Sequence, residues 1–321
     1  MAKRMLSEKQ FLFLFGTLVF LSSCAGLKTS NEIKAEKPKG QQIISDKDLR
    51  EPAPVEAQTQ PIIDTAVGQP AVTPPAPVQA AANIKGVPRI GIIFSAGGAK
   101  VFGHIGVLKE IEKAKWPIRA VGGLEWGSAV AASYAHRLSA NEVEWELSKL
   151  KDFEDVKQAA DTLYANKSVA DLKVPFVCPS INISKQERFL LNRGQLAQLI
   201  PYCVAHPPLS KAYGQSVADL DAVSYIAQHL RTTGAKKIVF INVLTQKSKK
   251  SFAGDINSAE NILYVKAAIE ASRKAYGVDD LIQIDLGDYD IDDLDDKREI
   301  IAKAAELSYD QIVKLTRKYG L

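Results

Sequence analysis

The sequence predicts an α/β fold in three α/β/α layers, with a mostly parallel central sheet covered by helices on both faces. From residue 88 onward, short apolar segments alternate with longer segments whose apolar residues recur every three or four positions. Short apolar runs are typical of buried strands, and the longer spacing is typical of helices that pack through one face. Regular alternation of the two favours parallel strands joined by crossover helices.

The predicted elements follow one another in a simple order. A strand at 89–98 ends in glycines and leads into a helix at 101–114. Ser139 with Glu142 predicts a capping box at the start of a helix at 141–151. Further strands are expected at 118–123, 174–184, 236–245 and 280–286. Further helices are expected at 128–138, 194–202, 258–277 and 297–320.

The first 23 residues have the pattern of an export signal. Basic residues are followed by an apolar run at 11–21, which is too short to span a bilayer as a helix. The run ends in "LSSC" at 21–24, which resembles the bacterial lipoprotein signal. The resemblance implies removal of residues 1–23, acylation of Cys24 with fatty acids such as palmitate, and membrane anchoring in the cell envelope. Ala25 favours the outer membrane, facing the periplasm, and an uncleaved anchor is the alternative.

Residues 24–87 are predicted to form a lipid-anchored, disordered tether. They are rich in Pro, Ala, Gln and charged residues and have almost no aromatic residues. Such a segment cannot bury enough apolar surface to fold alone. The globular domain is therefore expected at 88–321, held by the tether at a distance from the lipid surface.

Composition and spacing exclude several classes of function. The net charge is only +4 and the basic residues form no dense stripe, so no nucleic-acid partner is expected. The glycine loop at 95–100 matches neither nucleotide-binding fingerprint, so no cofactor is expected. The acidic run at 279–296 lacks the EF-hand glycine, and no zinc-ligand spacing is present, so no metal is expected. Cys178 and Cys203 are predicted to form a disulfide outside the cytoplasm or to remain buried thiols.

The segment "RAVGGLEWGSAVAASYA" at 119–135 carries most of the information about chemistry. Gly123 and Gly127 flank position 125 where a strand passes into a helix. In many hydrolases this pattern is G-x-S-x-G, with the nucleophilic serine on a tight turn. Here the middle residue is Glu125. The earlier loop "SAGGAK" at 95–100 also leads from a strand into a helix, and it is predicted to bind an oxyanion.

These stretches resemble the patatin-like phospholipase family over about residues 88–320. The family reads "SGGGAKGFAHIGVL" where this chain reads "SAGGAKVFGHIGVL" at 95–108, and its G-x-S-x-G follows at the same distance. The resemblance implies a patatin-like sandwich and a lipid acyl hydrolase that uses a Ser-Asp dyad. It also implies an oxyanion loop in which Gly97, Gly98 and Ala99 supply backbone N–H groups.

The chain departs from the family at both reactive positions. Glu125 stands where the family has serine. Counting back from the strand at 236–245, the family's Asp-Gly motif falls on Tyr213-Gly214-Gln215, so the aspartate position is Tyr213. Asp219 and Asp221 are alternatives if the alignment shifts by a few residues.

These substitutions change what the site can do. A carboxylate is a weak nucleophile, although Glu125 as a general base for water is an alternative. At a helix amino terminus, Glu125 is favoured by the helix dipole and is expected to accept the N–H groups of the loop, so that the site occupies itself. The loop also carries Ala96 and Val101 where the family has glycine. A β-branched Val101 is expected to distort or narrow the oxyanion site.

The predicted function is that of a membrane-anchored pseudoenzyme that binds a lipid, a fatty acid or a protein partner. One alternative is an active lipid acyl hydrolase, a phospholipase or esterase, of altered mechanism using Glu125. Another is a structural protein of the envelope. His104 is expected to be structural, and Trp126 is expected either to plug an acyl groove or to pack in the core.

Overall fold

The computed structural model describes residues 88–207, 209–245, 259–292 and 294–321. The predicted signal peptide, the Cys24 anchor and the tether lie outside the described residues. The strands are β1 Ile90–Phe94, β2 Ile118–Gly123, β3 Phe176–Asn182, β4 Glu187–Leu191, β5 Ser216–Ala218, β6 Lys237–Thr245 and β7 Asp280–Asp285. The helices are α1 Phe102–Lys113, α2 Trp126–Arg137, α3 Ala140–Leu147, α4 Val156–Tyr164, α5 Leu196–Val204, α6 Val223–Thr232, α7 Ala259–Ala271 and α8 Lys297–Tyr319, with 3₁₀ turns η1 Gly98–Val101 and η2 Val169–Asp171.

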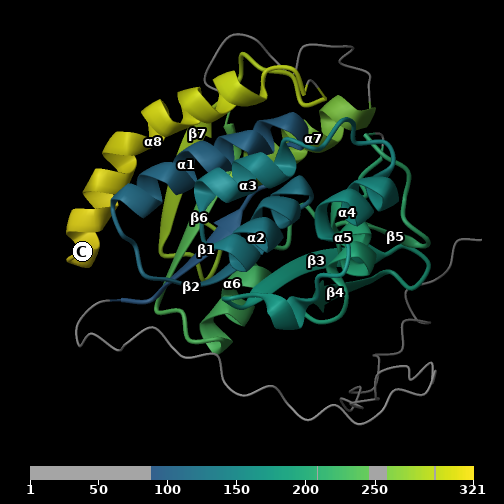
Figure 1. Ribbon diagram of the computed structural model, residues 1–321, viewed down its shortest axis with the longest axis horizontal. Helices are drawn as coiled ribbons and strands as arrows, with labels where there is room; N and C mark the ends of the chain where they lie inside the picture. Colours follow the sequence, from purple (N-terminus) through teal and green to yellow (C-terminus); the bar gives the residue numbers. More distant parts are fainter. Residues whose placement is uncertain (1–87, 208, 246–258, 293) are drawn as a thin grey trace, which may run out of the picture. The chain divides into compact units, whose positions relative to one another are not determined.

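The strands form one sheet whose centre is parallel (Figure 1). The strand order is β4-β3-β2-β1-β6-β7, and β5 also pairs with β3. Strands β1, β2, β3, β6 and β7 are paired in parallel. Strands β4 and β5 run antiparallel to β3. The predicted mostly parallel sheet is confirmed.

Helices cover both faces of the sheet. A Cβ on Gly122 would lie 2.4 Å from Ile226 of α6, whereas a Cβ on Gly123 would lie 2.2 Å from the carbonyl oxygen of Gly127 in α2. Consecutive residues of a strand point to opposite faces, so α6 and α2 lie on opposite faces. Helices α1, α3 and α8 pack together on the α2 side (Figure 1). The three predicted layers are therefore confirmed.

The central strand β1 is covered from both sides. Ile90, Ile92, Ile93 and Phe94 are completely buried. This is the usual state of a parallel strand with helices on both faces, and each such side chain contributes about 1.5–3 kcal/mol by burial. Within the described ranges, no helix is long and apolar enough to cross a bilayer.

Several elements differ from the sequence prediction. Helices α4 and α6 and strands β4 and β5 were not predicted. Strand β4 has no fully buried residue and no alternation of apolar and polar residues, and β5 has only three residues. Helix α7 ends at Ala271, before the predicted end at 277. At the predicted capping box, the Ser139 hydroxyl accepts the N–H of Glu142 at 3.4 Å.

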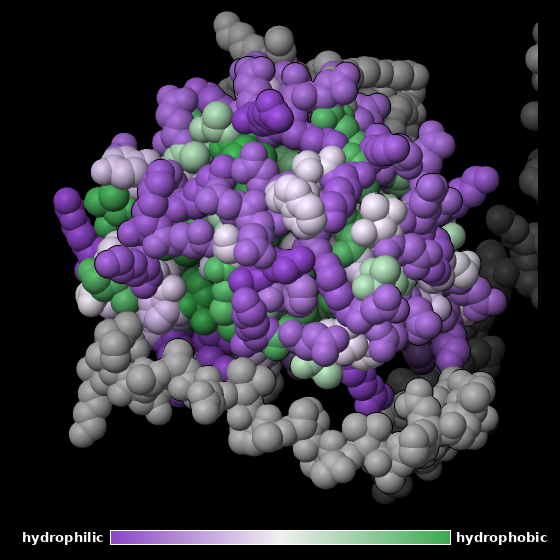
Figure 2. Space-filling model, in the orientation of Figure 1, coloured by the Kyte–Doolittle hydropathy of each residue, from purple (hydrophilic) through white to green (hydrophobic). Residues whose placement is uncertain are grey.

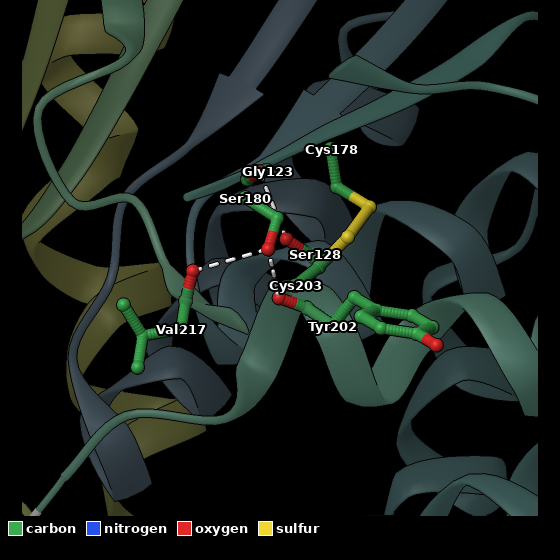
Figure 3. Close-up of a disulfide and its surroundings, with 7 residues drawn as sticks. All are labelled: Gly123, Ser128, Cys178, Ser180, Tyr202, Cys203 and Val217. Carbon is green, nitrogen blue, oxygen red and sulfur yellow. Dashed lines mark hydrogen bonds between the residues drawn. A yellow bond between two sulfur atoms is a disulfide. The ribbon is translucent and has the colours of Figure 1, made fainter. Parts of the chain in front are cut away.

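A disulfide joins Cys178 of β3 to Cys203 of α5 (Figure 3). Both cysteines are fully buried. In the same strand, the Ser180 hydroxyl lies 2.6 Å from the carbonyl oxygen of Tyr202 and 3.1 Å from that of Val217 (Figure 3). Strand β3, helix α5 and strand β5 are thus joined by a covalent bond and by hydrogen bonds.

Candidate ligand site at the elbow turn

The turn between β2 and α2 has the backbone geometry of a nucleophile elbow. Glu125 has φ 47° and ψ −133°, in a region that residues other than glycine rarely adopt. The glycines around it are required by close packing, because a Cβ on Gly127 would lie 2.3 Å from the carbonyl oxygen of Ser95. Gly123 has equally little space, next to Gly127 itself. The sequence therefore builds a strained strand-to-helix turn with a glutamate at its tip.

The glycine loop points two donors at this glutamate. The N–H groups of Gly97 and Gly98 donate to Oε2 of Glu125 at 2.9 and 3.1 Å. Gly98 has φ 51°, and a Cβ there would lie 2.0 Å from the carbonyl oxygen of Ile291, so only glycine fits. The side chain of Glu125 thus occupies the position at which the two N–H groups converge.

The third predicted donor of the loop is directed elsewhere. The N–H of Ala99 donates to the carbonyl oxygen of Ile291 at 2.6 Å. The predicted oxyanion loop of Gly97, Gly98 and Ala99 is corrected to its two glycines. Val101 packs in the hydrophobic core. The distortion expected from Val101 does not affect these two donors, because the N–H groups of both glycines still reach Oε2 of Glu125.

A tyrosine from a distant helix closes the other side of the carboxylate. The hydroxyl of Tyr264 in α7 donates to Oε1 of Glu125 at 3.1 Å, and the backbone N–H of Trp126 also donates to the carboxylate. The ring of His206 packs edge-on against Tyr264, with 5.3 Å between ring centroids. Sequence reasoning did not find Tyr264. Its spacing to the buried Ala267 indicates an inward position, but nothing in the pattern indicates its partner.

Burial dominates the electrostatics of the site. Glu125 has no exposed surface, and this burial raises its pKa from 4.5 to about 7, against the opposing effect of its hydrogen bonds. Burial lowers the pKa of His206 to about 4. Among the described residues, Nε2 of His206 has no hydrogen-bond partner. Buried polar atoms normally form at least one hydrogen bond, so Nε2 of His206 is a candidate to bind a water or a ligand next to the elbow.

Three neighbours of the elbow have structural roles. Trp126 is 1% exposed and packs against Phe153, with ring centroids 5.0 Å apart, so it belongs to the core. The Ser128 hydroxyl donates to the carbonyl oxygen of Gly123 at 2.8 Å (Figure 3). His104 is buried, which lowers its pKa to about 3, and its Nε2 lies 3.0 Å from the backbone carbonyl oxygen of the first residue of the glycine loop.

The residues considered for the aspartate position have other partners. The ring of Tyr213 packs edge-on against Tyr202, with centroids 4.9 Å apart. Asp219 is buried, forms an ion pair with Arg188 of β4 and accepts the N–H of Asp221 at 3.1 Å. The carboxylate at the elbow takes its hydrogen bonds from the loop, from the start of α2 and from α7.

A groove of about 790 Å³ lies beside the elbow. Its wall carries Leu209, whose Cδ1 is 3.2 Å from the position a Cβ on Gly98 would take. Ser210, also in the wall, accepts the N–H of His206 at 2.9 Å. The wall of the groove therefore reaches the glycine loop at Gly98. The lining residues are Glu154, Asp155, Val156, Lys157, Pro207, Leu209, Ser210, Lys211, Ala212 and Tyr213.

The acidic run after β7 faces a buried cation. Lys100 of the glycine loop is 1% exposed, and desolvation lowers its pKa to about 8. The charges of Asp290, Asp285 and Asp288 oppose this shift and stabilise the ammonium group. The acidic run thus has an electrostatic role toward Lys100. In the part of the chain that the structure describes, no cluster of three or more His, Cys, Asp or Glu residues is arranged to hold a metal ion.

The three-layer sheet, the elbow turn and the glycine loop define an α/β scaffold of the acyl-hydrolase kind. No protein-family model matches the chain. Patatin-like phospholipase domain-containing protein 6 of Mus musculus is 26% identical over 184 residues, which cover 49% of this chain and 14% of that protein. Lysophospholipase NTE1 of Coccidioides immitis is 44% identical over 46 residues, which cover 14% of this chain and 3% of that protein. These matches support a relation of the chain to the patatin-like phospholipase family, and the chain matches only a small part of the length of these relatives.

Two solved structures are also similar to the chain. VipD from Legionella pneumophila has a TM-score of 0.42 and 12% identity, covering 72% of this chain and 67% of that one. The type III effector protein ExoU has a TM-score of 0.40 and 11% identity, covering 71% of this chain and 54% of that one.

Proposed function

We propose that this protein is a membrane-anchored pseudoenzyme that binds an acyl-bearing lipid or fatty acid without hydrolysing it. The observation that carries the proposal is the carboxylate of Glu125 on the N–H groups of Gly97 and Gly98. In an acyl hydrolase, such donors stabilise the negative oxygen that develops in the transition state. Donors that already hold a carboxylate cannot serve this purpose. The carboxylate itself is a weak nucleophile.

The position of the second dyad member supports the same conclusion. A serine nucleophile needs a neighbouring group that takes its proton. At the matching position the chain has Tyr213, whose ring packs on Tyr202. The nearby carboxylate of Asp219 is engaged by Arg188. A restored serine at position 125 would therefore lack a base.

The groove beside the elbow is the proposed ligand site. Its lining contains apolar Val156 and Leu209, which suit an acyl chain. Basic Lys211 is also in the lining and would favour an anionic head, although the lining includes the acidic Glu154 and Asp155 as well. His206 links this groove to the elbow, because its backbone N–H donates to Ser210 of the groove wall and its ring packs against Tyr264. Two similar proteins are named for phospholipase or lysophospholipase activity, which also favours a lipid as the ligand.

The proposal includes the envelope location predicted from the amino terminus. Cys24 would carry the lipid anchor, and the domain would face the periplasm from the outer membrane. A protein partner in the envelope is the alternative ligand. A purely structural role in the envelope would use neither the groove nor the elbow.

A second candidate function is hydrolysis with Glu125 as general base. The observation that favours it is a pKa of about 7, which suits proton transfer near neutral pH. Against it, Glu125 is completely buried and both carboxylate oxygens accept hydrogen bonds, so a water would have to displace one of these partners.

The test compares wild type with Glu125→Ala and Glu125→Gln. Wild type should show no turnover above background with short-chain esters or phospholipid vesicles, and no labelling by a fluorophosphonate probe. Glu125→Ala empties the two-donor site and should bind decanoate more tightly than wild type does. Glu125→Gln is the matched control, because its amide oxygen still occupies the donors of Gly97 and Gly98, so its decanoate affinity should stay at the wild-type level.

Other outcomes identify the alternatives. Wild-type hydrolysis that Glu125→Ala abolishes would establish Glu125 as a catalytic base. Absence of decanoate or lipid binding by all three proteins would favour the structural role. Glu125→Ser should remain inactive, whereas Glu125→Ser combined with Tyr213→Asp is expected to gain slight activity.

A further inference from the structure

Helix α7 carries apolar side chains on two opposite sides. Tyr264 and Ala267 point inward and are buried. Ile262, Val265 and Ile269 recur at helical spacing on the outer side and are 57%, 39% and 50% exposed. A helix on the surface of a soluble domain normally has a polar outer face. The outer stripe, formed by Ile262, Val265 and Ile269, is therefore expected to contact an apolar environment.

This concentration of exposed apolar residues is local. Half of the exposed large hydrophobic residues found in the described ranges lie between Ile262 and Tyr276. Single exposed apolar residues are common, but a contiguous group marks an interaction surface. The face drawn in Figure 2 is mainly hydrophilic, with small and separate hydrophobic areas.

The charges around the outer stripe are those of a membrane interface. Lys266 is exposed beside the stripe, and Arg273 and Lys274 are exposed just after the helix. Tyr276 is 79% exposed at the same end. Basic residues around an apolar helix face, together with an aromatic ring with a polar tip, favour an anionic lipid surface. The carboxylate of Glu270 lies 3.8 Å from the guanidinium group of Arg273. This ion pair reduces the repulsion between Glu270 and anionic lipid.

We propose that the outer stripe of α7 lies in the interfacial region of an anionic lipid bilayer. The choice of a bilayer rests on the proposed lipidation of Cys24, which is separated from Pro88 by residues 25–87. A coil of that length has an end-to-end distance of about 45 Å, so an anchored domain stays within reach of the membrane. The lipid-facing helix is also the helix whose Tyr264 closes the elbow, at 3.1 Å from Glu125. Contact with lipid is thereby brought within about one helix diameter of Glu125.

The test places an environment-sensitive NBD label on each of two variants of the full-length protein that gain one cysteine. Cys178 and Cys203 are joined in a disulfide, and acylation of Cys24 would remove its thiol, so the added cysteine is the one labelled. Ile269→Cys labels the outer stripe of α7. Ile183→Cys is the matched control, because Ile183 is 52% exposed and lies outside α7, just after β3. Both proteins are reconstituted in vesicles that contain phosphatidylglycerol, with or without brominated lipids. The label at 269 should shift to the blue and lose emission with brominated lipid, and the label at 183 should do neither.

Each outcome decides the proposal. Equal emission from both labels, unaffected by bromine, would overturn it by showing that α7 faces water. A blue shift at 269 that depends on protein density and not on bromine would assign the stripe to a second copy of the chain. The mass of Cys24 is measured separately. If Cys24 carries no lipid, the anchoring proposal fails, and the label at 269 is placed on a Cys24→Ser background that is added to preformed vesicles: quenching at 269 still supports α7 contact, and no quenching overturns it.

Discussion

Replacing Glu125 with glutamine should remove a specific pH dependence of stability. Burial raises the pKa of Glu125 from 4.5 to about 7 in the folded protein. At about 1.4 kcal/mol per pKa unit, this shift corresponds to a free energy of about 3 kcal/mol. Glutamine is close in size to glutamate. Its carbonyl oxygen can accept the N–H groups of Gly97 and Gly98, and its amide can donate to Tyr264, so packing should change little.

The sign of the effect follows from proton binding. The folded protein holds the proton on Glu125 more tightly than the unfolded chain does, so folding is favoured while the group is protonated. This contribution is complete below pH 4.5. Between pH 4.5 and 7 the unfolded chain loses its proton first, and stability falls as the pH rises. By pH 8 the contribution of about 3 kcal/mol should be lost.

The assay is urea unfolding of wild type and Glu125→Gln at pH values from 4.5 to 8. The free energy of unfolding of wild type, minus that of the variant, should fall by about 3 kcal/mol across this range. The buried His104 and His206 have lowered pKa values and gain protons on unfolding at low pH. Both histidines are present in wild type and in the variant, so their effect cancels in the difference between the two free energies of unfolding. A difference that stays constant with pH would refute the assignment of a raised pKa to Glu125.

Two further predictions concern the cysteines. Replacing Cys178 and Cys203 together by alanine should lower the free energy of unfolding by about 3 kcal/mol, because the disulfide closes a loop with a sequence separation of 25 residues. An unchanged urea midpoint under non-reducing conditions would argue against this contribution. Cys24→Ser should release the protein from the membrane or leave its precursor uncleaved, as seen by fractionation and mass measurement. A processed Cys24→Ser protein that remains in the membrane would contradict the anchor.

The parts of the fold that follow from local patterns could be predicted from the sequence. The central strands β1 and β6 consist largely of consecutive buried apolar residues, because both of their faces are covered. Strands β2 and β7 carry shorter apolar segments that are buried only in part. Helix α6 carried the same kind of signal in Val223, Ile226 and Leu230, which are buried at helical spacing, although it was not predicted. Strand β4 could not be found in this way, because it pairs at the sheet edge and buries little surface.

Residues of the candidate site could likewise be predicted where they belong to a local motif and could not where they depend on distant contacts. The glycines that bring the loop to Glu125 are visible in the sequence, because their spacing belongs to a motif. The partner Tyr264 is not visible, because it lies 139 positions away and its contact depends on how α7 crosses the sheet. The role of Ala99 was wrong for a related reason, since its N–H is taken by Ile291 from a separate segment.

The elbow turn offers protein engineers a host position for new chemistry. Its unusual backbone at residue 125 costs on the order of 1–3 kcal/mol, and that cost belongs to the turn and not to the glutamate. The close packing of Gly123 and Gly127 would hold another side chain at the same point. A cysteine or a synthetic nucleophile installed there would meet two aligned N–H donors in a site that excludes water. A turn that fixes its own backbone in this way is a starting point from which a catalyst could be built one residue at a time.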